Sequence, residues 1–299
     1  MRPLNTKYHI AIVGSGVVGK ATGSILVKQG FDVSFLDINP IVINELILNG
    51  YKAYLPDEFD SSRIDVYFVS VQTYTDPNDD GLSYLKNSCD KLAQWIKTRN
   101  KYTLIVIRST ILPGTIEEVL IPIIKNSSGK KPGMDFDVCF NPEFLRETSA
   151  LSDFENPWIV VIGTNNDKPG DILEEIYFWV KCKIYRVSIK ESETQKFIHN
   201  MINASKISFF NEMRLVCDRL NLDADIVFDL TSKSAEAMWN PSYGIANKGS
   251  FRGKCLPKDT KAFLNYANNH LGINLKMLKA VIDVNNMMGK INPTKDSKS

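Results

Sequence analysis

Short apolar runs alternate with helical patterns from the start of the chain to about residue 190. Six runs rich in β-branched and aromatic residues predict strands at 10–13, 32–36, 65–71, 103–107, 138–140 and 158–162. Between them, apolar residues recur every three or four positions and predict helices near 17–29, 41–49, 82–98 and 114–125. Most of the strand runs are continuously apolar, which is typical of strands that helices cover on both faces. The pattern therefore predicts a doubly wound, parallel α/β sheet.

A different pattern begins near residue 190. The segment 191–220 contains no glycine or proline, and its apolar residues recur at helical spacing. Further helical patterns follow at 223–231, 257–269 and 275–288. We therefore expect a sheet-containing domain over 1–190, an all-helical domain over 191–289 that opens with a long helix, and a tail over 290–299. A length of 299 residues also suggests two domains.

The composition narrows the class of protein. With 43% hydrophobic and 23% charged residues, the chain reads as a globular protein that buries a core. A formal net charge of +2 does not indicate binding to nucleic acid or to a membrane surface. No stretch approaches the roughly 18 consecutive apolar residues of a membrane span. The N-terminus lacks a signal-peptide pattern. We therefore expect a cytoplasmic protein with neither nucleic acid nor a membrane as partner.

A glycine-rich loop follows the first predicted strand and precedes the first predicted helix. Its residues are Gly14, Ser15, Gly16, Val17, Val18 and Gly19. Glycines at this spacing let the backbone approach a pyrophosphate, and the helix N-terminus stabilises the negative charge. Asp37 ends the second predicted strand, where a carboxylate hydrogen-bonds a ribose 2′-hydroxyl and repels a 2′-phosphate. The loop and Asp37 predict a dinucleotide site that favours NAD over NADP.

Cys255 stands apart from the other cysteines. Pro257 suits the first turn of the predicted helix that follows, so Cys255 would lie just before a helix N-terminus. The helix dipole, together with Lys254 and Lys258, would favour the thiolate. A thiolate beside a nicotinamide can capture an aldehyde as a thiohemiacetal, which a second hydride transfer converts to a thioester.

The remaining cysteines, Cys89, Cys139, Cys182 and Cys217, lie in apolar contexts and are expected to pack. Five scattered cysteines without a C-x-x-C pair argue against a disulfide framework and a zinc site. We therefore expect a reduced protein with no metal.

Several segments together resemble the UDP-glucose/GDP-mannose dehydrogenase family. They are GSGVVG (14–19), STILPGT (109–115), NPEFLRETSA (141–150), KFIHN (196–200), FFNE (209–212) and GKCLPKDTK (253–261). They follow the family's order across nearly the whole chain. The resemblance implies a four-electron oxidation of a nucleotide sugar that uses two NAD per sugar, on a Rossmann domain followed by a helical central domain.

The resemblance also implies individual catalytic roles. Cys255 would be the nucleophile, and Glu143 the general acid/base that hydrolyses the thioester. Lys196 and Asn200 lie four residues apart on the long predicted helix, so they share one face. A cation and an amide there stabilise a developing alkoxide and oxyanion. The implied catalytic residues are Cys255, Glu143, Lys196, Asn200, Asp259 and Thr110, of which the last two would hold the catalytic water.

Binding residues follow from the same resemblance. Beyond the glycine loop and Asp37, the cofactor would contact Gln72, Thr73, Ser109, Thr110, Glu147 and Lys258. The substrate would contact Glu143, Phe144, Leu145, Arg146, Glu147, Lys196, Asn200, Phe251 and Gly253. Thr73 belongs to VQTYT (71–75), which stands where the family has its cofactor loop, with Tyr74 in place of a proline.

The chain also departs from the family pattern. Family members usually continue past the helix that ends near Met288 into a second Rossmann-like domain that helps to bind the nucleotide. The segment 37–65 is shorter than usual, and Arg252 replaces a glycine of the substrate loop. Either the nucleotide is held differently, or another chain supplies the missing surface, or activity is reduced.

The sequence therefore leaves three alternative functions. The first is a nucleotide-sugar 6-dehydrogenase, most simply for UDP-glucose, with GDP-mannose or an N-acetylated UDP-hexosamine as other substrates of the same class. The second is a module that binds NAD or a nucleotide sugar without turnover. The third is a single-step β-hydroxyacid dehydrogenase, which uses a Lys–Asn helix pair but needs no cysteine nucleophile.

An oligomer is expected as well. The long helix near 191–219 carries apolar residues around more of its circumference than a two-layer domain would bury, so it needs a second packing partner. The resemblance implies a homodimer built on the helical domain, and a two-fold dimer is also the commonest oligomer.

Overall fold

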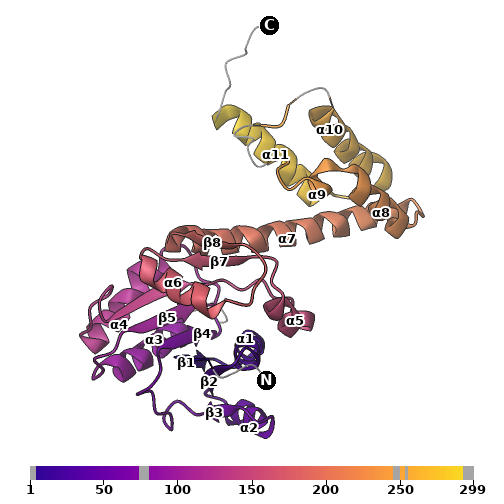
Figure 1. Ribbon diagram of the computed structural model, residues 1–299. Coiled ribbons are helices and arrows are strands. Elements are labelled where there is room, and N and C mark those ends of the chain that lie inside the picture. The colour runs from indigo at the N-terminus through magenta and orange to yellow at the C-terminus, as the bar shows by residue number, and fades with distance from the viewer. Residues whose placement is uncertain (1–4, 74–80, 245–249, 253–254, 292–299) are drawn as a thin grey trace. The chain divides into compact units, whose positions relative to one another are not determined.

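The computed structural model describes residues 5–73, 81–244, 250–252 and 255–291 (Figure 1). The chain forms two compact units, Met1–His199 and Asn200–Ser299. The helix α7 (Ile189–Arg219) begins in unit 1 and ends in unit 2. The expected domain boundary near 190 thus lies at the start of α7, whereas the division between the units falls within that helix.

The described part of unit 1 contains one eight-stranded sheet with the strand order β3-β2-β1-β4-β5-β6-β7-β8. The strands are β1 (Asn5–Val13), β2 (Phe31–Leu36), β3 (Lys52–Tyr54), β4 (Val66–Val69), β5 (Thr103–Ile107), β6 (Phe136–Phe140), β7 (Val160–Gly163) and β8 (Ile184–Val187). Neighbouring strands are parallel except β6 and β7. The order from β3 to β6 is that of dinucleotide-binding sheets, which confirms the predicted fold class.

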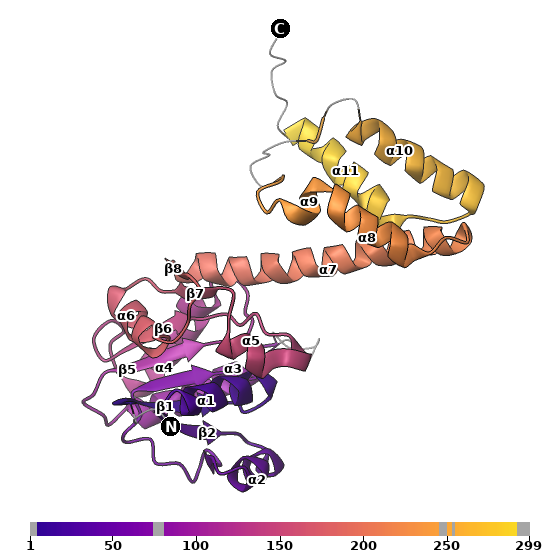
Figure 2. The same cartoon turned by 45° about the vertical axis from the view of Figure 1, so that its right-hand side comes forward.

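Helices cover both faces of the sheet (Figure 2). They are α1 (Val17–Lys28), α2 (Pro40–Leu48), α3 (Ser83–Ile96), α4 (Ile121–Ser128), α5 (Ala150–Glu155) and α6 (Asp167–Ile176). Because side chains alternate along a strand, Ile10 and Ile12 of β1 join one core with Leu26 of α1, while Ala11 joins the other core with Leu92 of α3. Both faces of the strands are therefore buried, as the continuous apolar runs predicted.

Two strands and one pairing differ from the expectation. The sequence analysis missed β3 and β8, because β3 has only three residues and β8 is not fully buried. The expected all-parallel sheet is wrong at β6 and β7, which run antiparallel and pair only at Phe140 and Gly163. A helical turn and α5 lie between these two strands, and neither was predicted.

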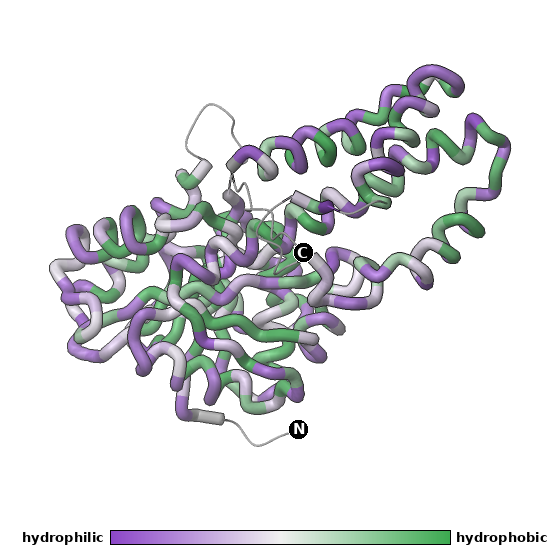
Figure 3. Tube along the Cα trace, turned by 90° about the horizontal axis from the view of Figure 1, so that it is seen from above, coloured by the Kyte–Doolittle hydropathy of each residue, from purple (hydrophilic) through white to green (hydrophobic). Residues whose placement is uncertain are grey.

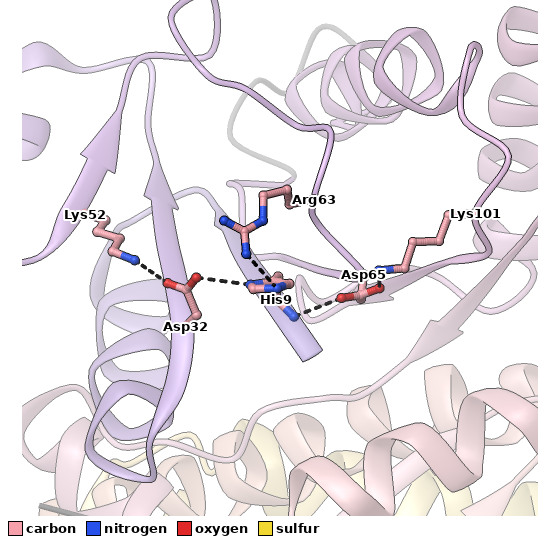
Figure 4. A network of polar contacts seen from close by, with 6 residues as sticks. All are labelled: His9, Asp32, Lys52, Arg63, Asp65 and Lys101. Atoms are coloured by element: carbon pink, nitrogen blue, oxygen red, sulfur yellow. Dashed lines mark hydrogen bonds and ion pairs between the residues drawn. The ribbon is translucent and has the colours of Figure 1, made fainter. Parts of the chain in front are cut away.

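A polar network fastens the amino-terminal edge of the sheet, opposite the glycine loop (Figure 4). His9 Nδ1 lies 3.0 Å from Asp32 Oδ2, and Lys52 Nζ donates to Asp32 Oδ1 at 2.6 Å. The His9 backbone N–H donates to Asp65 Oδ2 at 3.0 Å, and Asp65 also pairs with Lys101. The hydrogen bond from Lys52 lowers the pKa of Asp32. These contacts connect His9, in the middle of β1, to the starts of β2 and β3 and to Asp65, which directly precedes β4.

The described residues of unit 2 are helical, as predicted. Besides the end of α7 they form α8 (Ala224–Ser234), α9 (Glu236–Trp239), α10 (Leu256–Tyr266) and α11 (Lys276–Ile291). Glu212 of α7 accepts hydrogen bonds from the backbone N–H groups of Met277 and Leu278 at the start of α11, at 2.8 and 3.1 Å. The small core consists of Val216, Ala267, Leu271, Leu275, Leu278 and Ile282. Hydrophilic and hydrophobic residues alternate along these helices (Figure 3).

Across the residues that the structure describes, no helix combines the length and the apolarity that a membrane crossing requires.

Candidate active site

The glycine loop lies between β1 and α1. Gly14 has φ +86°, and a Cβ there would lie 2.6 Å from the carbonyl oxygen of Ser70. A Cβ on Gly19 would lie 1.9 Å from the carbonyl oxygen of Gly14, so both positions require glycine. Gly16 precedes α1 and has no heavy atom within 4 Å of the position where a Cβ would stand. The open approach to Gly16 and the helix N-terminus fits the pyrophosphate of a dinucleotide.

Asp37 connects the end of β2 to this loop. Its Oδ2 accepts a hydrogen bond from the Ser15 backbone N–H at 2.8 Å, and its Oδ1 accepts one from Asn39 N–H at 2.9 Å. A carboxylate has about four lone-pair positions, so these two bonds leave capacity for ribose hydroxyls. The sequence predicted only the ribose contact, and the structure adds a role in shaping the loop.

The predicted cofactor residues after β4 and β5 lie together. Thr73 Oγ1 donates to the Thr110 carbonyl oxygen at 2.8 Å, and Ser109 Oγ donates to the Val71 carbonyl oxygen at 2.5 Å. The two loops are therefore tied to each other at the carboxyl edge of the sheet, and Gln72 between the bonded residues is exposed. Tyr74 lies outside the described residues.

Glu143 and Lys196 form an ion pair that is largely buried. Glu143 lies in the loop after β6, and Lys196 lies on α7. Lys196 Nζ is 3.1 Å from Glu143 Oε1 and also donates to the Glu143 carbonyl oxygen. The side chains of Lys196 and Glu143 are 5% and 18% exposed. The structure thus brings together two of the residues to which the sequence analysis assigned catalytic roles.

Two aromatic rings lie beside this ion pair. Lys196 Nζ is 5.2 Å from the centre of the Phe144 ring, a distance at which the ring attracts the cation. The Phe144 ring centre is 4.8 Å from that of His199. Burial, and then the charge of Lys196, lower the pKa of His199 below its ordinary value. His199 had no role in the sequence analysis, although it lies within the KFIHN segment.

Arg146 and Asp153 close the loop that contains Glu143. The Arg146 guanidinium donates to both Asp153 oxygens, at 3.0 and 2.6 Å, and Ser149 Oγ donates to Asp153 at 3.0 Å. The hydrogen bonds from Arg146 hold the pKa of Asp153 well below its usual range. The substrate contacts expected for Arg146 and Glu147 stay predictions. The observed partner of Arg146 is Asp153, and Glu147 is exposed.

Cys255 directly precedes α10 and is exposed, which confirms its predicted position at a helix N-terminus. Its carbonyl oxygen accepts a hydrogen bond from Asp259 N–H at 2.8 Å. Asp259 pairs with Lys258 at 3.2 Å, and both side chains are mostly exposed. Gly253 and Lys254 lie outside the described residues.

Two further predicted site residues also belong to unit 2. Asn200 on α7 is partly buried. The Phe251 backbone N–H donates to Asn285 Oδ1 at 2.6 Å, and Asn285 Nδ2 donates back to the Phe251 carbonyl oxygen at 3.3 Å. An amide on α11 therefore holds the backbone just before the cysteine segment.

The other cysteines pack, as predicted. Cys89 and Cys139 are buried in the two cores of unit 1, and burial raises the pKa of the Cys89 thiol to about 12. Cys217 is buried in unit 2, and Cys182 is partly buried. Of the five thiols, that of Cys255 alone is exposed. Within the described ranges, no group of three or more His, Cys, Asp or Glu side chains is placed to hold a metal ion.

Comparisons with known proteins agree with these features. A profile of the "UDP-glucose/GDP-mannose dehydrogenase family, NAD binding domain" matches residues 52–181, and a profile of the family's central domain matches residues 190–287. The GDP-mannose 6-dehydrogenase of Pseudomonas aeruginosa is 32% identical over 298 residues, which span 93% of this chain and 68% of that protein. The chain belongs to the UDP-glucose/GDP-mannose dehydrogenase family. Its cofactor is NAD, which the glycine loop and Asp37 fit.

Other members of the UDP-glucose/GDP-mannose dehydrogenase family are about as similar. The UDP-glucose 6-dehydrogenase of Rickettsia conorii is 34% identical over 311 residues, covering 95% of this chain and 69% of that protein. Among solved structures, a ternary complex of GDP-mannose dehydrogenase from Pseudomonas aeruginosa has a TM-score of 0.88 at 30% identity, over 96% of this chain and 71% of that one. A UDP-glucose dehydrogenase from Pyrobaculum islandicum has a TM-score of 0.70 at 28% identity, over 97% and 70%.

Proposed function

We propose that the chain is an NAD-dependent nucleotide-sugar 6-dehydrogenase that oxidises the C6 alcohol of the sugar to a carboxylate. The buried Glu143–Lys196 pair carries this proposal. It joins an acid/base group and a cation inside an NAD-binding unit, in a chain that also has an exposed cysteine at a helix start. A module that only binds would not need a desolvated ion pair, which is costly to bury.

Bound NAD supplies the hydride acceptor for each of the two oxidations. The glycine loop and Asp37 would hold its pyrophosphate and ribose, and Thr73, Ser109 and Thr110 would line the loops beside it. The ammonium of Lys196 stabilises the alkoxide that forms as the C6 hydroxyl gives its proton to water, and loss of a hydride from this alkoxide gives the aldehyde. The amide of Asn200 is a second hydrogen-bond donor for the same oxygen.

Cys255 then acts as the nucleophile. Its thiolate adds to the aldehyde carbon, and the resulting oxyanion takes up a proton to give a thiohemiacetal. A thioester remains once this adduct has lost a hydride, which bound NAD would accept, and a proton, which passes to water. Glu143 removes a proton from water, which attacks the thioester carbonyl and releases the carboxylate and the free thiol. Asp259 and Thr110 would orient that water. The chemistry needs a reduced Cys255, which cytoplasmic reductants maintain.

UDP-glucose, giving UDP-glucuronate, is the first of two substrates to test, because relatives named UDP-glucose 6-dehydrogenase are 34% and 33% identical to this chain. GDP-mannose is the second, since the TM-score with the GDP-mannose dehydrogenase is higher than that with the UDP-glucose dehydrogenase, 0.88 against 0.70. Identities of 32% and 34% to the two kinds of relative do not separate them.

The deciding experiment counts NADH formed per sugar consumed, with each sugar nucleotide in turn. Two NADH per sugar with a carboxylate product supports the proposal. One NADH per sugar indicates the single-step hydroxyacid reaction, and no NADH with either sugar indicates a binding module. The sugar with the higher kcat/KM is the substrate.

We also propose that unit 2 forms a homodimer. Within unit 2, six apolar side chains on α7 and α8 are more than half exposed: Met201, Ile202, Ile207, Leu215, Ile226 and Leu230. Uncovered apolar surface of this kind marks an interface. Light scattering at micromolar concentration should give twice the chain mass, and Leu230→Arg should give a monomer. Leu48→Arg, at an exposed position of α2 in unit 1, is the control and should stay dimeric. A monomeric wild type would contradict the proposal.

A further inference from the structure

A buried arginine lies next to the proposed acid/base group. Arg108 directly follows β5 and precedes Ser109 and Thr110, and it is 2% exposed. Its Nη1 donates to Asn141 Oδ1 and, at 3.0 Å, to the hydroxyl of Tyr177. The Tyr177 hydroxyl in turn donates to Asn141 Oδ1 at 2.5 Å. Asn141 and Tyr177 are buried as well, so the three side chains form a closed network.

This network lies where the sheet is weakest. β6 and β7 run antiparallel and pair at a single position, Phe140 with Gly163. Asn141 follows β6, and its Nδ2 donates to the Val161 carbonyl oxygen of β7 at 2.8 Å. Its backbone N–H donates to the Ile107 carbonyl oxygen of β5 at 2.9 Å. Asn141 therefore fastens the start of the Glu143 loop to both neighbouring strands.

The path from Arg108 to Glu143 is short. Pro142, whose ring fixes its φ angle, is the one residue between Asn141 and Glu143. Arg108, Asn141, Glu143 and Tyr177 all line the same small cavity of about 30 Å³. Because Lys196 holds the other side of Glu143, through its carboxylate and its carbonyl oxygen, the loop is fixed from two directions.

Stability alone is a poor explanation for Arg108. Across the described ranges it pairs with no carboxylate, and its Nε has no hydrogen-bond acceptor. Its guanidinium carbon lies 5.1 Å from the centre of the Phe154 ring instead. Burying a charge without a counter-charge is unfavourable, and an apolar side chain would fill the same space at lower cost. What the guanidinium adds is its Nη1 group, which donates to both Asn141 Oδ1 and the Tyr177 hydroxyl and so fixes the orientation of Asn141.

We propose that Arg108 and Tyr177 are positioning residues that hold the Glu143 loop in its reactive place through Asn141. The role assigned to Glu143 rests on the proposed function, whereas the mechanical coupling does not. Removing the Tyr177 hydroxyl should let Glu143 shift relative to Lys196, and small displacements of a catalytic group cost much of its rate.

Tyr177→Phe is the first test, and Tyr102→Phe is its matched control. Tyr102 is a second tyrosine of unit 1, partly buried, and its hydroxyl donates to Asp137 at 2.8 Å, away from the Glu143 loop. We expect Tyr177→Phe to lower kcat for sugar oxidation at least roughly tenfold. KM for NAD should stay unchanged, and Tyr102→Phe should leave kcat unchanged. If the two variants lose kcat equally, or if KM for NAD rises in place of the fall in kcat, the positioning role is wrong.

A double-mutant cycle on stability tests the coupling between Tyr177 and Glu143 without an activity assay. Tyr177→Phe and Glu143→Gln are made singly and together, and urea unfolding gives the equilibrium constant of each. Each substitution changes the equilibrium constant of unfolding by some factor. We expect the factor for the double variant to differ from the product of the two single factors by at least about threefold, as for residues that share a network. The same cycle with Tyr102→Phe should show independent effects. Independence of Tyr177 and Glu143 overturns the proposal, even if the wild type oxidises neither sugar and the proposed function fails separately.

Discussion

The two units expose their functional groups to different degrees. In unit 1, the side chains of Lys196 and Glu143 are 5% and 18% exposed. In unit 2, the side chains of Lys258 and Asp259 are 73% and 64% exposed, and the thiol of Cys255 is exposed. Charges interact strongly in a desolvated site and weakly in water. The charges of the Glu143–Lys196 pair in unit 1 therefore interact strongly, whereas Cys255 of unit 2 is an exposed reactive group at the start of a helix.

The two units also differ in how completely they bury their apolar side chains. Unit 1 buries a core on each face of its sheet, while unit 2 has a small core and leaves apolar side chains of α7 and α8 uncovered. A substitution at the site in unit 1 should therefore change folding as well as chemistry. A substitution at the exposed site in unit 2 should change chemistry alone.

The largest effect is expected for Cys255→Ser. We expect it to abolish carboxylate formation, since a hydroxyl does not replace the thiolate. Because the side chain is exposed, the free energy of unfolding should change by less than about 0.5 kcal/mol. Product analysis and urea unfolding measure the two effects, and Cys182→Ser should retain activity. A normal NADH yield from Cys255→Ser would refute the covalent mechanism.

Lys196→Met, in unit 1, should lower stability as well as activity. It leaves Glu143 without its cation in a largely buried site, so we expect a loss of about 3 kcal/mol in the free energy of unfolding. The control is Lys190→Met on the same helix, where Lys190 and Glu118 lie 3.6 Å apart and both side chains are mostly exposed. That change should cost less than about 1 kcal/mol. If both variants lose the same free energy of unfolding, burial of the Glu143–Lys196 pair makes no difference to stability.

Asp37→Asn tests the cofactor loop of unit 1. The amide keeps an oxygen acceptor for the loop but loses the negative charge that repels a 2′-phosphate. A hydrogen bond to a charged group contributes about 1.5–3 kcal/mol, so the preference for NAD over NADP should fall at least about tenfold. Steady-state kcat/KM with each cofactor measures it, and Asn39→Ala should leave the preference intact. Equal use of both cofactors by the wild type would overturn the assignment.

The smallest effect concerns His199. Burial lowers its pKa below the ordinary value of 6.5, so the unfolded chain binds this proton more tightly than the fold does. The stability of unit 1 contributed by neutral His199 is therefore complete above pH 6.5 and is lost as pH falls through the folded pKa. An NMR titration should give a folded pKa below 6.5, and His199→Gln should reduce the acid dependence of urea unfolding. A folded pKa above 6.5 would contradict the burial.

Much of the fold follows from sequence pattern because its strands are continuous apolar runs. The predicted strand at 103–107 matches β5, and the glycine loop and the long helix lie where expected. β3 and β8 were missed because their residues are not fully buried, so hydrophobicity does not mark them. The reversal between β6 and β7 was missed because strand direction depends on the connection, which here runs through α5.

The sequence placed the candidate site residues by two routes. The position of Cys255 before a helix N-terminus with lysines nearby pointed to a reactive thiol, whereas the roles expected of Glu143 and Lys196 came from the family resemblance. Arg108 and Tyr177 were missed because their contact joins residues 69 positions apart, which no local pattern shows. The signal that was present is the position of Arg108, directly before Ser109 and Thr110.

The central claim is that Glu143 of unit 1 and Cys255 of unit 2 act in one reaction. Mass spectrometry of the Glu143→Gln variant, after incubation with NAD and the sugar nucleotide that the wild type oxidises, tests this claim most directly. Without its base the variant should stall at the thioester, so the peptide containing Cys255 should carry the mass of the uronyl group. The same peptide from Glu143→Gln, Cys255→Ser should carry none. An unmodified Cys255, with full carboxylate release by Glu143→Gln, would contradict the account.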